Sequence, residues 1–95
     1  MKDLALSFIG KGEVGKFTFK QRLANSHAYL YEVADITSNK IHYEVFRRKV
    51  NKLYNCISYP SSKAFGIWAW TFVSRRKALQ KFKDIENEGK GTIST

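Results

Sequence analysis

Apolar and polar residues alternate over residues 16–23, near the beginning of the chain. One side of this pattern is apolar and consists of Phe17, Phe19 and Leu23. The other side consists of Thr18, Lys20 and Arg22. Because the side chains of a strand point alternately to its two faces, the pattern predicts a half-buried strand with a basic outer face.

Three further segments have patterns typical of strands, namely Ala28–Ile36, Ile41–Lys49 and Lys52–Tyr59. The turn sequences between them are rich in Asn, Ser and Asp and are too short for a parallel crossover. The four strands are therefore predicted to form an antiparallel meander.

Alternation in the third of these four strands predicts two different faces. The face toward the interior is formed by Ile41, Tyr43 and Val45. The opposite face is formed by His42, Glu44, Phe46 and Arg48.

Two segments allow more than one interpretation. Residues 1–10 fit a short helix ended by Gly10 or a short strand, and the glycine-rich residues 10–16 that follow fit a turn. Residues 60–73 fit a helical stripe or, through Trp68, Trp70 and Phe72, one face of a strand. For this second segment we predict a helical turn at Ser61–Phe65, an end at Gly66 and a strand at Ile67–Val73.

A helix is predicted from Arg75 to about Asn87, with Ser74 as its N-cap. Its apolar stripe consists of Ala78, Leu79, Phe82 and Ile85. The remaining residues, Gly89–Thr95, are predicted to be a frayed tail.

These elements predict an α+β fold for residues 1–95, in which one small domain contains an antiparallel meander of four to five strands packed by a C-terminal helix. A content of 43% hydrophobic and 15% aromatic residues supports a folded core. The order of four strands followed by a helix is similar to that of small single-stranded nucleic-acid-binding domains such as those of the Pur family.

The chain is strongly basic, since 17 lysines and arginines face 8 acidic residues and give a net charge of +9. Such a charge favours polyanionic partners, which include nucleic acids and acidic proteins. Cys56 is the single cysteine, so no disulfide within the chain is expected and a reducing cytoplasm is the predicted location. No signal peptide or membrane-spanning run is recognised, and no membrane partner is predicted.

The charges of the predicted C-terminal helix are reversed relative to its dipole. Arg75, Arg76 and Lys77 occupy the first turn, where the dipole favours acidic side chains. An anion bound at this end would make the arrangement favourable. A second dense group of cations, between the third and fourth strands, leads to the hypothesis that both groups lie on one accessible surface.

Exposed Tyr or Phe rings beside such cations could stack on unpaired bases. The rings considered are Tyr29, Tyr31, Phe46, Tyr54 and Tyr59, of which Phe46 is favoured by its position in the alternation. Trp68 and Trp70 are predicted to be core residues, or a protein interface if exposed. The predicted binding residues are therefore Lys20, Arg22, Phe46, Arg47, Arg48, Lys49, Lys52, Arg75, Arg76, Lys77 and Lys81.

The sequence supports three functional hypotheses. The first is a non-catalytic module that binds RNA or single-stranded DNA. The second is an inhibitor or accessory protein of a phage or mobile element that binds an acidic or nucleic-acid-binding protein, for example a CRISPR nuclease. The third is a ribosome-directed, RNA-cleaving toxin that uses His42 with Glu44 and Arg48. No enzyme activity, metal or cofactor is predicted, because no metal-ligand spacing or paired carboxylates are found.

Overall fold

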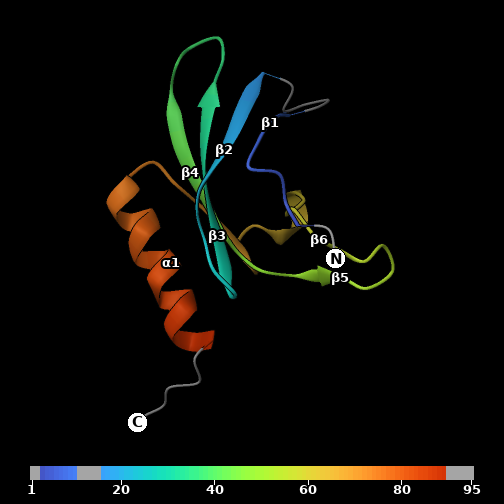
Figure 1. The fold of residues 1–95 in the computed structure, drawn as a ribbon. Coiled ribbons are helices and arrows are strands. Elements are labelled where there is room, and N and C mark those ends of the chain that lie inside the picture. Colours follow the sequence, from blue (N-terminus) through green and yellow to red (C-terminus); the bar gives the residue numbers. More distant parts are fainter. Residues whose placement is uncertain (1–2, 11–15, 90–95) are drawn as a thin grey trace.

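The structure, a computed structural model, describes residues 3–10 and 16–89 and is built around a five-stranded antiparallel sheet (Figure 1). The strands of this sheet are β1 (Ser7–Ile9), β2 (Phe17–Ala24), β3 (Ala28–Asp35), β4 (Ile41–Arg47) and β7 (Ala69–Phe72). Two short strands, β5 (Val50–Asn51) and β6 (Cys56–Ile57), form a separate hairpin. The helical elements are η2 (Ser62–Ala64) and α1 (Arg75–Gly89).

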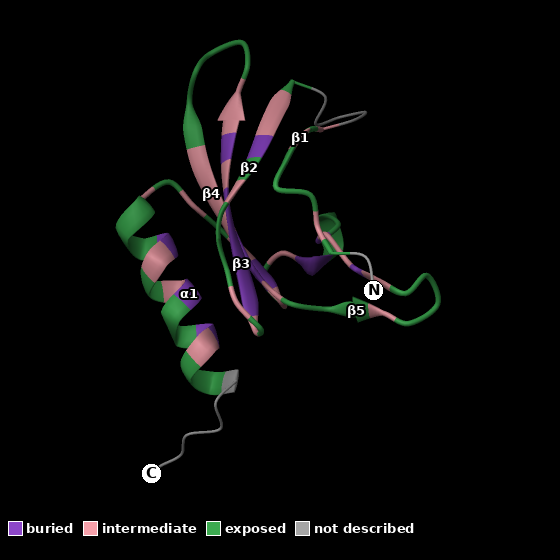
Figure 2. Ribbon diagram, viewed as in Figure 1, coloured by how far each residue is buried: buried purple, intermediate pink, exposed green. Residues whose placement is uncertain are grey.

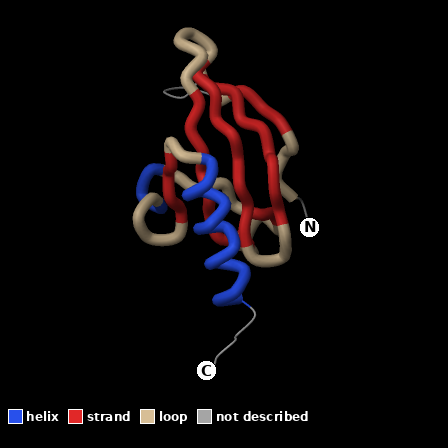
Figure 3. Tube along the Cα trace, turned by 90° about the vertical axis from the view of Figure 1, so that its left-hand side faces the viewer, coloured by secondary structure: helices blue, strands red, loops and turns tan. Residues whose placement is uncertain are grey.

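The main sheet has the strand order β1-β2-β3-β4-β7, and every pairing in it is antiparallel. The helix α1 lies across one face, as Figure 3 shows from its side. The N-terminal segment, the β5–β6 hairpin and η2 lie on the other side of the sheet (Figure 1). The predicted α+β fold with a C-terminal helix is therefore confirmed.

Both faces of the sheet are covered, so β3 is buried along most of its length (Figure 2). The core on the helix side contains Ala28, Leu30, Val45, Ala78, Phe82 and Ile85. The core on the opposite side contains Phe19, Tyr29, Tyr31, Val33, Phe46, Ile57, Ala64 and Ala69. Burial of a strand on both faces removes the contrast between an inner and an outer face.

The two faces predicted for β4 alternate as expected, but the prediction that the face with Phe46 is exposed is wrong for this reason. Val45 packs on the helix side, whereas its neighbour Phe46 is 0% exposed and lies in the opposite core. Phe46 stacks on Tyr29 and Tyr31, with ring centroids 5.5 and 5.7 Å apart, and Tyr59 meets it edge on. Phe46 is therefore a central core residue and presents no ring to a ligand.

The prediction of one strand over Lys52–Tyr59 is also wrong. Asn51 turns the chain, because its Oδ1 accepts hydrogen bonds from the backbone N–H groups of Leu53 and Tyr54 at 3.1 and 3.2 Å. Asn55 completes the turn in the left-handed region, at φ 51°. The segment thus folds back on itself as the β5–β6 hairpin, and β7 takes the place beside β4.

A β-bulge at Arg22 corrects the predicted face of Leu23. Gln21 pairs with Tyr31 and Leu23 with Leu30, so Arg22 is an additional residue in β2. An additional residue reverses the alternation that follows it. Leu23 therefore lies on the helix side of the sheet, opposite Phe19, and remains exposed.

Three other predictions can be compared with the structure. The N-terminal element is a strand, β1, which pairs with β2. The helical turn is η2, and Gly66 follows it at φ 89° before β7. Gly12, Gly15 and residues 90–95 lie outside the described residues, while Gly89 ends α1.

The helix α1 begins as predicted after Ser74, whose Oγ accepts a hydrogen bond from the backbone N–H of Lys77 at 3.3 Å. This is the N-cap to N3 bond that satisfies one of the free amides of the first turn. The first turn of α1 contains no acidic residue, so the charges of the helix are reversed relative to its dipole, as predicted. No helix among the described residues is long and apolar enough to cross a membrane.

Candidate functional site

The two predicted groups of cations do not meet on one surface. Arg47, at the end of β4, forms an ion pair of 2.6 Å with Glu88, near the end of α1. Arg75 opens the same helix, about 20 Å from Glu88 at 1.5 Å per residue. The expectation of a single surface formed by the helix start and the strand connection is therefore not met.

Three of the predicted arginines are engaged within the protein. Arg22 forms an ion pair of 3.1 Å with Glu32 on β3, and Arg47 pairs with Glu88. Arg48 lies beside Tyr29 and Asp3, where the hydrogen bond from Tyr29 and, to a smaller extent, the Arg48 charge lower the pKa of the Asp3 carboxyl. These contacts place Arg22 and Arg48 in structural roles.

The tyrosines considered as stacking rings are mostly core residues. Tyr29 and Tyr31 are buried in the sheet, and Tyr59 packs against the rings of Phe8, Phe19 and Phe46. Tyr54 alone of the five candidates is exposed, at the tip of the β5–β6 hairpin. With Phe46 also buried, the expected stacking surface on β3 and β4 does not exist.

Instead, Trp70 in β7 and Trp68, the residue just before β7, lie among cations. The Nζ of Lys81 lies 3.9 Å from the centroid of the Trp70 ring, and the guanidinium carbon of Arg47 lies 5.6 Å from it. The Nζ of Lys49 lies 5.6 Å from the centroid of Trp68. Both rings are partly exposed. Trp70 packs with the helix-side core and Trp68 with the core of the opposite face, so the two rings lie on either side of the β7 edge of the sheet. We call Trp68, Trp70, Arg47, Lys49 and Lys81, which border this edge, the Trp–cation surface.

The local structure explains why these five residues border the β7 edge. The backbone N–H of Arg47 donates to the carbonyl of Trp68 at 2.9 Å, which fixes β7 against the end of β4. Lys81 lies on the flank of α1 that also carries Glu88, because residues seven apart share one side of a helix. The contact between Glu88 and Arg47 therefore brings this flank of α1 to Trp70.

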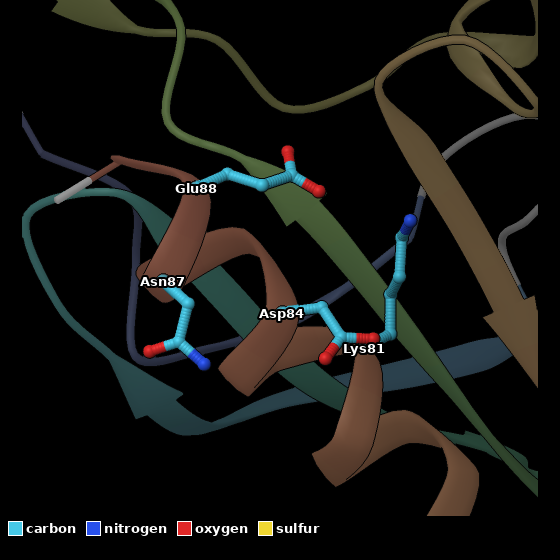
Figure 4. A pocket seen from close by; sticks show the side chains of 4 residues that line it. All are labelled: Lys81, Asp84, Asn87 and Glu88. Atoms are coloured by element: carbon cyan, nitrogen blue, oxygen red, sulfur yellow. The ribbon is translucent and has the colours of Figure 1, made fainter. Parts of the chain in front are cut away.

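Acidic residues limit the Trp–cation surface along α1. A pocket of about 620 Å³ is lined by Lys81, Asp84, Asn87 and Glu88. Figure 4 shows Lys81 and Glu88 extending to the same side of α1, with Asp84 between them along the helix. Asp84 and Glu88 therefore oppose the positive potential of Lys81 along this part of α1.

Charge distribution along the sequence is the signal that could have located this side of the molecule. No aspartate or glutamate occurs between Glu44 and Asp84. The cations of this segment are Arg47, Arg48, Lys49, Lys52, Lys63, Arg75, Arg76, Lys77, Lys81 and Lys83. The segment contains β7 at the edge of the sheet, the β5–β6 hairpin and η2 on one side of it and the first part of α1 on the other.

The remaining predicted cations lie at separate places. Lys20 is exposed on β2, and Lys52 is exposed in the turn of the β5–β6 hairpin. At the start of α1, a pocket of about 470 Å³ is lined by Ser74, Arg76, Lys77 and Gln80. Among the described residues, Arg75, Arg76 and Lys77 form no ion pair. This group of cations is available to anions but is separate from the Trp–cation surface.

The residues considered for catalysis form a structural network. The Tyr59 hydroxyl donates a hydrogen bond to Glu44 Oε1, and His42 Nε2 lies 3.4 Å from Glu44 Oε2. Arg48 lies elsewhere, beside Tyr29, so the triad imagined from the sequence is not assembled. Within the described parts of the chain, no three His, Cys, Asp or Glu side chains are grouped to hold a metal ion.

Two buried tyrosines make the stability of the protein sensitive to alkaline pH. Burial and the hydrogen bond to Asp3 raise the pKa of Tyr29 to about 12, and burial beside Glu44 raises the pKa of Tyr59 further. In the unfolded chain both phenols ionise near pH 10. Neutral phenols therefore stabilise the fold fully below pH 10, and this contribution is lost as the pH rises toward the folded-state pKa values.

We expect the free energy of unfolding to fall by about 1.4 kcal/mol per pH unit for each of these tyrosines between about pH 10 and 12. Urea denaturation at a series of pH values measures this slope. Tyr59→Phe removes one titrating phenol, so the slope should become shallower by one tyrosine. An unchanged slope in Tyr59→Phe would contradict the assignment.

No family model, curated protein sequence or solved structure matches this chain. The function is therefore argued from the geometry and charge of its own residues.

Proposed function

We propose that this protein is a non-catalytic binding module for single-stranded nucleic acid, RNA or DNA, and that it binds through the Trp–cation surface. The observation that carries the proposal is the placement of three cations within 6 Å of two partly exposed tryptophan rings. Proteins that bind single strands combine aromatic rings for base stacking with cations for the phosphates. A cytoplasmic location, where RNA and a reduced Cys56 thiol occur together, is part of this proposal.

Binding replaces a cation–π contact of the free protein with a base stack. Lys81 occupies the face of Trp70, at a distance typical of a cation–π contact worth about 0.5–1 kcal/mol at an exposed site. A base that stacks on Trp70 displaces the Lys81 ammonium, which can then contact the adjacent phosphate. Stacking contributes about 1–3 kcal/mol for each base, so the exchange is favourable.

The proposal is tested by fluorescence anisotropy with labelled oligouridine and oligodeoxythymidine over a range of salt concentrations. Affinity should fall with salt at a slope of about −0.7 in log K against log salt for each phosphate contact on a single strand, hence about −1.4 for Lys49 and Lys81 together. Arg47 is not counted, because it is already paired with Glu88. Absence of binding to both oligomers at low salt would show that the proposal is wrong.

Two charge-reversal variants distinguish binding at this surface from a general effect of net charge. Lys49→Glu is expected to weaken binding about tenfold, because it removes one phosphate contact and adds repulsion. Lys40→Glu changes the net charge equally, but Lys40 lies in the turn between β3 and β4, at the opposite end of β4 from Arg47. Equal losses in the two variants would contradict a defined surface. Copurification with a stoichiometric acidic protein, resistant to nuclease, would support a protein partner instead.

A further inference from the structure

The β5–β6 hairpin exposes two large apolar side chains that have no role in the core. Leu53 is 81% exposed and Tyr54 is 73% exposed, next to each other in the turn. The hairpin is a separate two-stranded sheet, and it projects from the main sheet on the side opposite α1 (Figure 1). A turn of this kind is normally formed by small polar residues. Leu53 and Tyr54 depart from this composition without adding to the core packing, which marks them as candidates for a functional role.

The tip that carries these side chains is held in a defined conformation. Asn51 Oδ1 accepts hydrogen bonds from the backbone N–H groups of both Leu53 and Tyr54. At the other end of the hairpin, Ile57 is buried in the core and the backbone N–H of Ser58 donates to the carbonyl of Lys49 at 2.8 Å. The two apolar side chains are therefore presented by a supported turn anchored to the domain.

The hairpin is continuous with the Trp–cation surface. Lys49 belongs to both, because its backbone closes the hairpin and its ammonium group lies over Trp68. Lys52 adds a second exposed cation next to Leu53. The hairpin lies within the segment that contains no acidic residue, so nothing in its own sequence repels phosphates.

We propose that Leu53 and Tyr54 form a wedge that inserts between bases where a single strand joins a duplex. This inference rests on the proposed function, and it names the class of nucleic acid that the surface recognises. Apolar side chains on a supported element unstack base steps, while neighbouring cations hold the phosphates. The single strand lies on Trp68, which is on the same side of the sheet as the hairpin, and continues around the β7 edge to Trp70. The duplex ends at the hairpin tip.

The test compares two RNA probes, an oligouridine strand and an RNA hairpin with a single-stranded tail of the same sequence and length. The tailed hairpin carries 2-aminopurine at its terminal base pair, which brightens when that base unstacks. The protein is expected to bind the tailed hairpin about tenfold more tightly than the free strand and to raise the 2-aminopurine fluorescence, because one inserted side chain replaces one base stack.

The double variant Leu53→Ser, Tyr54→Ser should lose both the preference and the fluorescence change, while its affinity for oligouridine stays within about twofold of the original. Both side chains are exposed, so its thermal unfolding should be unchanged. The matched control is Ile36→Ser, Val73→Ser, which removes two exposed apolar side chains elsewhere and should keep the preference.

The wedge is disproved if the tip variant retains the preference, or if the protein prefers the free strand, and either result leaves single-strand binding intact. If the protein binds neither probe, the proposed function is overturned together with the wedge. Sedimentation with phosphatidylserine vesicles tests whether the tip binds a membrane surface instead. Vesicle binding that depends on Leu53 and Tyr54 would assign the tip to a membrane surface and overturn the inference.

Discussion

Replacement of Phe46 with alanine is expected to lower the free energy of unfolding by about 3–5 kcal/mol, as is usual for a large aromatic residue removed from a core. Phe46 is fully buried and its ring contacts those of Tyr29, Tyr31, Tyr59 and Trp68. Losses of this size remove a large share of the stability of a small domain. Urea denaturation measures the change.

The control for this prediction is Tyr54→Ala, which removes an exposed aromatic side chain from the hairpin tip. Its unfolding free energy should remain within about 0.5 kcal/mol of the original. The opposite result, a stable Phe46→Ala protein that has lost affinity for nucleic acid, would mean that Phe46 lies on the surface as the alternation in the sequence predicts.

The largest loss of binding is expected when Trp68 and Trp70 are both replaced with leucine. Leucine retains much of the apolar volume of each side chain but offers no ring for stacking. Each lost base stack should weaken binding by about 1–3 kcal/mol, which is roughly 5- to 150-fold in Kd. Anisotropy with labelled oligouridine at about 0.1 M salt measures the loss.

Two further measurements make this prediction specific. Trp68→Phe and Trp70→Phe keep a smaller ring and should retain most of the affinity. Because the chain contains 2 tryptophans, quenching of its intrinsic tryptophan fluorescence on addition of oligouridine reports directly on this surface. Unchanged affinity in the double leucine variant would leave only the charges as the basis of binding.

The sequence predicted the strands and the helix correctly where one covered face or a cap dominates the pattern. Ser74 and the apolar stripe of α1 defined the helix, and the alternation around Phe19 defined β2. Gly66, at a positive φ, marked the boundary between η2 and β7. These are local signals, which a single sequence contains in full.

The misassigned residues depend on contacts between distant segments. Phe46 and Val45 are both apolar and both buried, Phe46 by the packing of Ile57 and Ala64 on the face opposite α1 and Val45 by α1 itself. The hairpin after β4 depends on one hydrogen-bonding side chain, Asn51, within a segment that otherwise resembles a strand. Local alternation does not contain this information.

The candidate site was only partly predictable for the same reason. Arg47, Lys49 and Lys81 were identified from their charge, but their common partner is a pair of tryptophans that the sequence assigned to the core. The pairing of Arg47 with Glu88 joins residues 41 positions apart, so the separation of the two cation groups emerges only in three dimensions.

The bulge at Arg22 also constrains how this chain can change during evolution. Removal of one residue there would restore uninterrupted alternation, and Leu23 and Ala24 would exchange the sides on which they now lie. The lineage is therefore expected to conserve the number of residues between Phe19 and Ala28, and to accept length variation in the turn between β3 and β4, where the backbone is exposed.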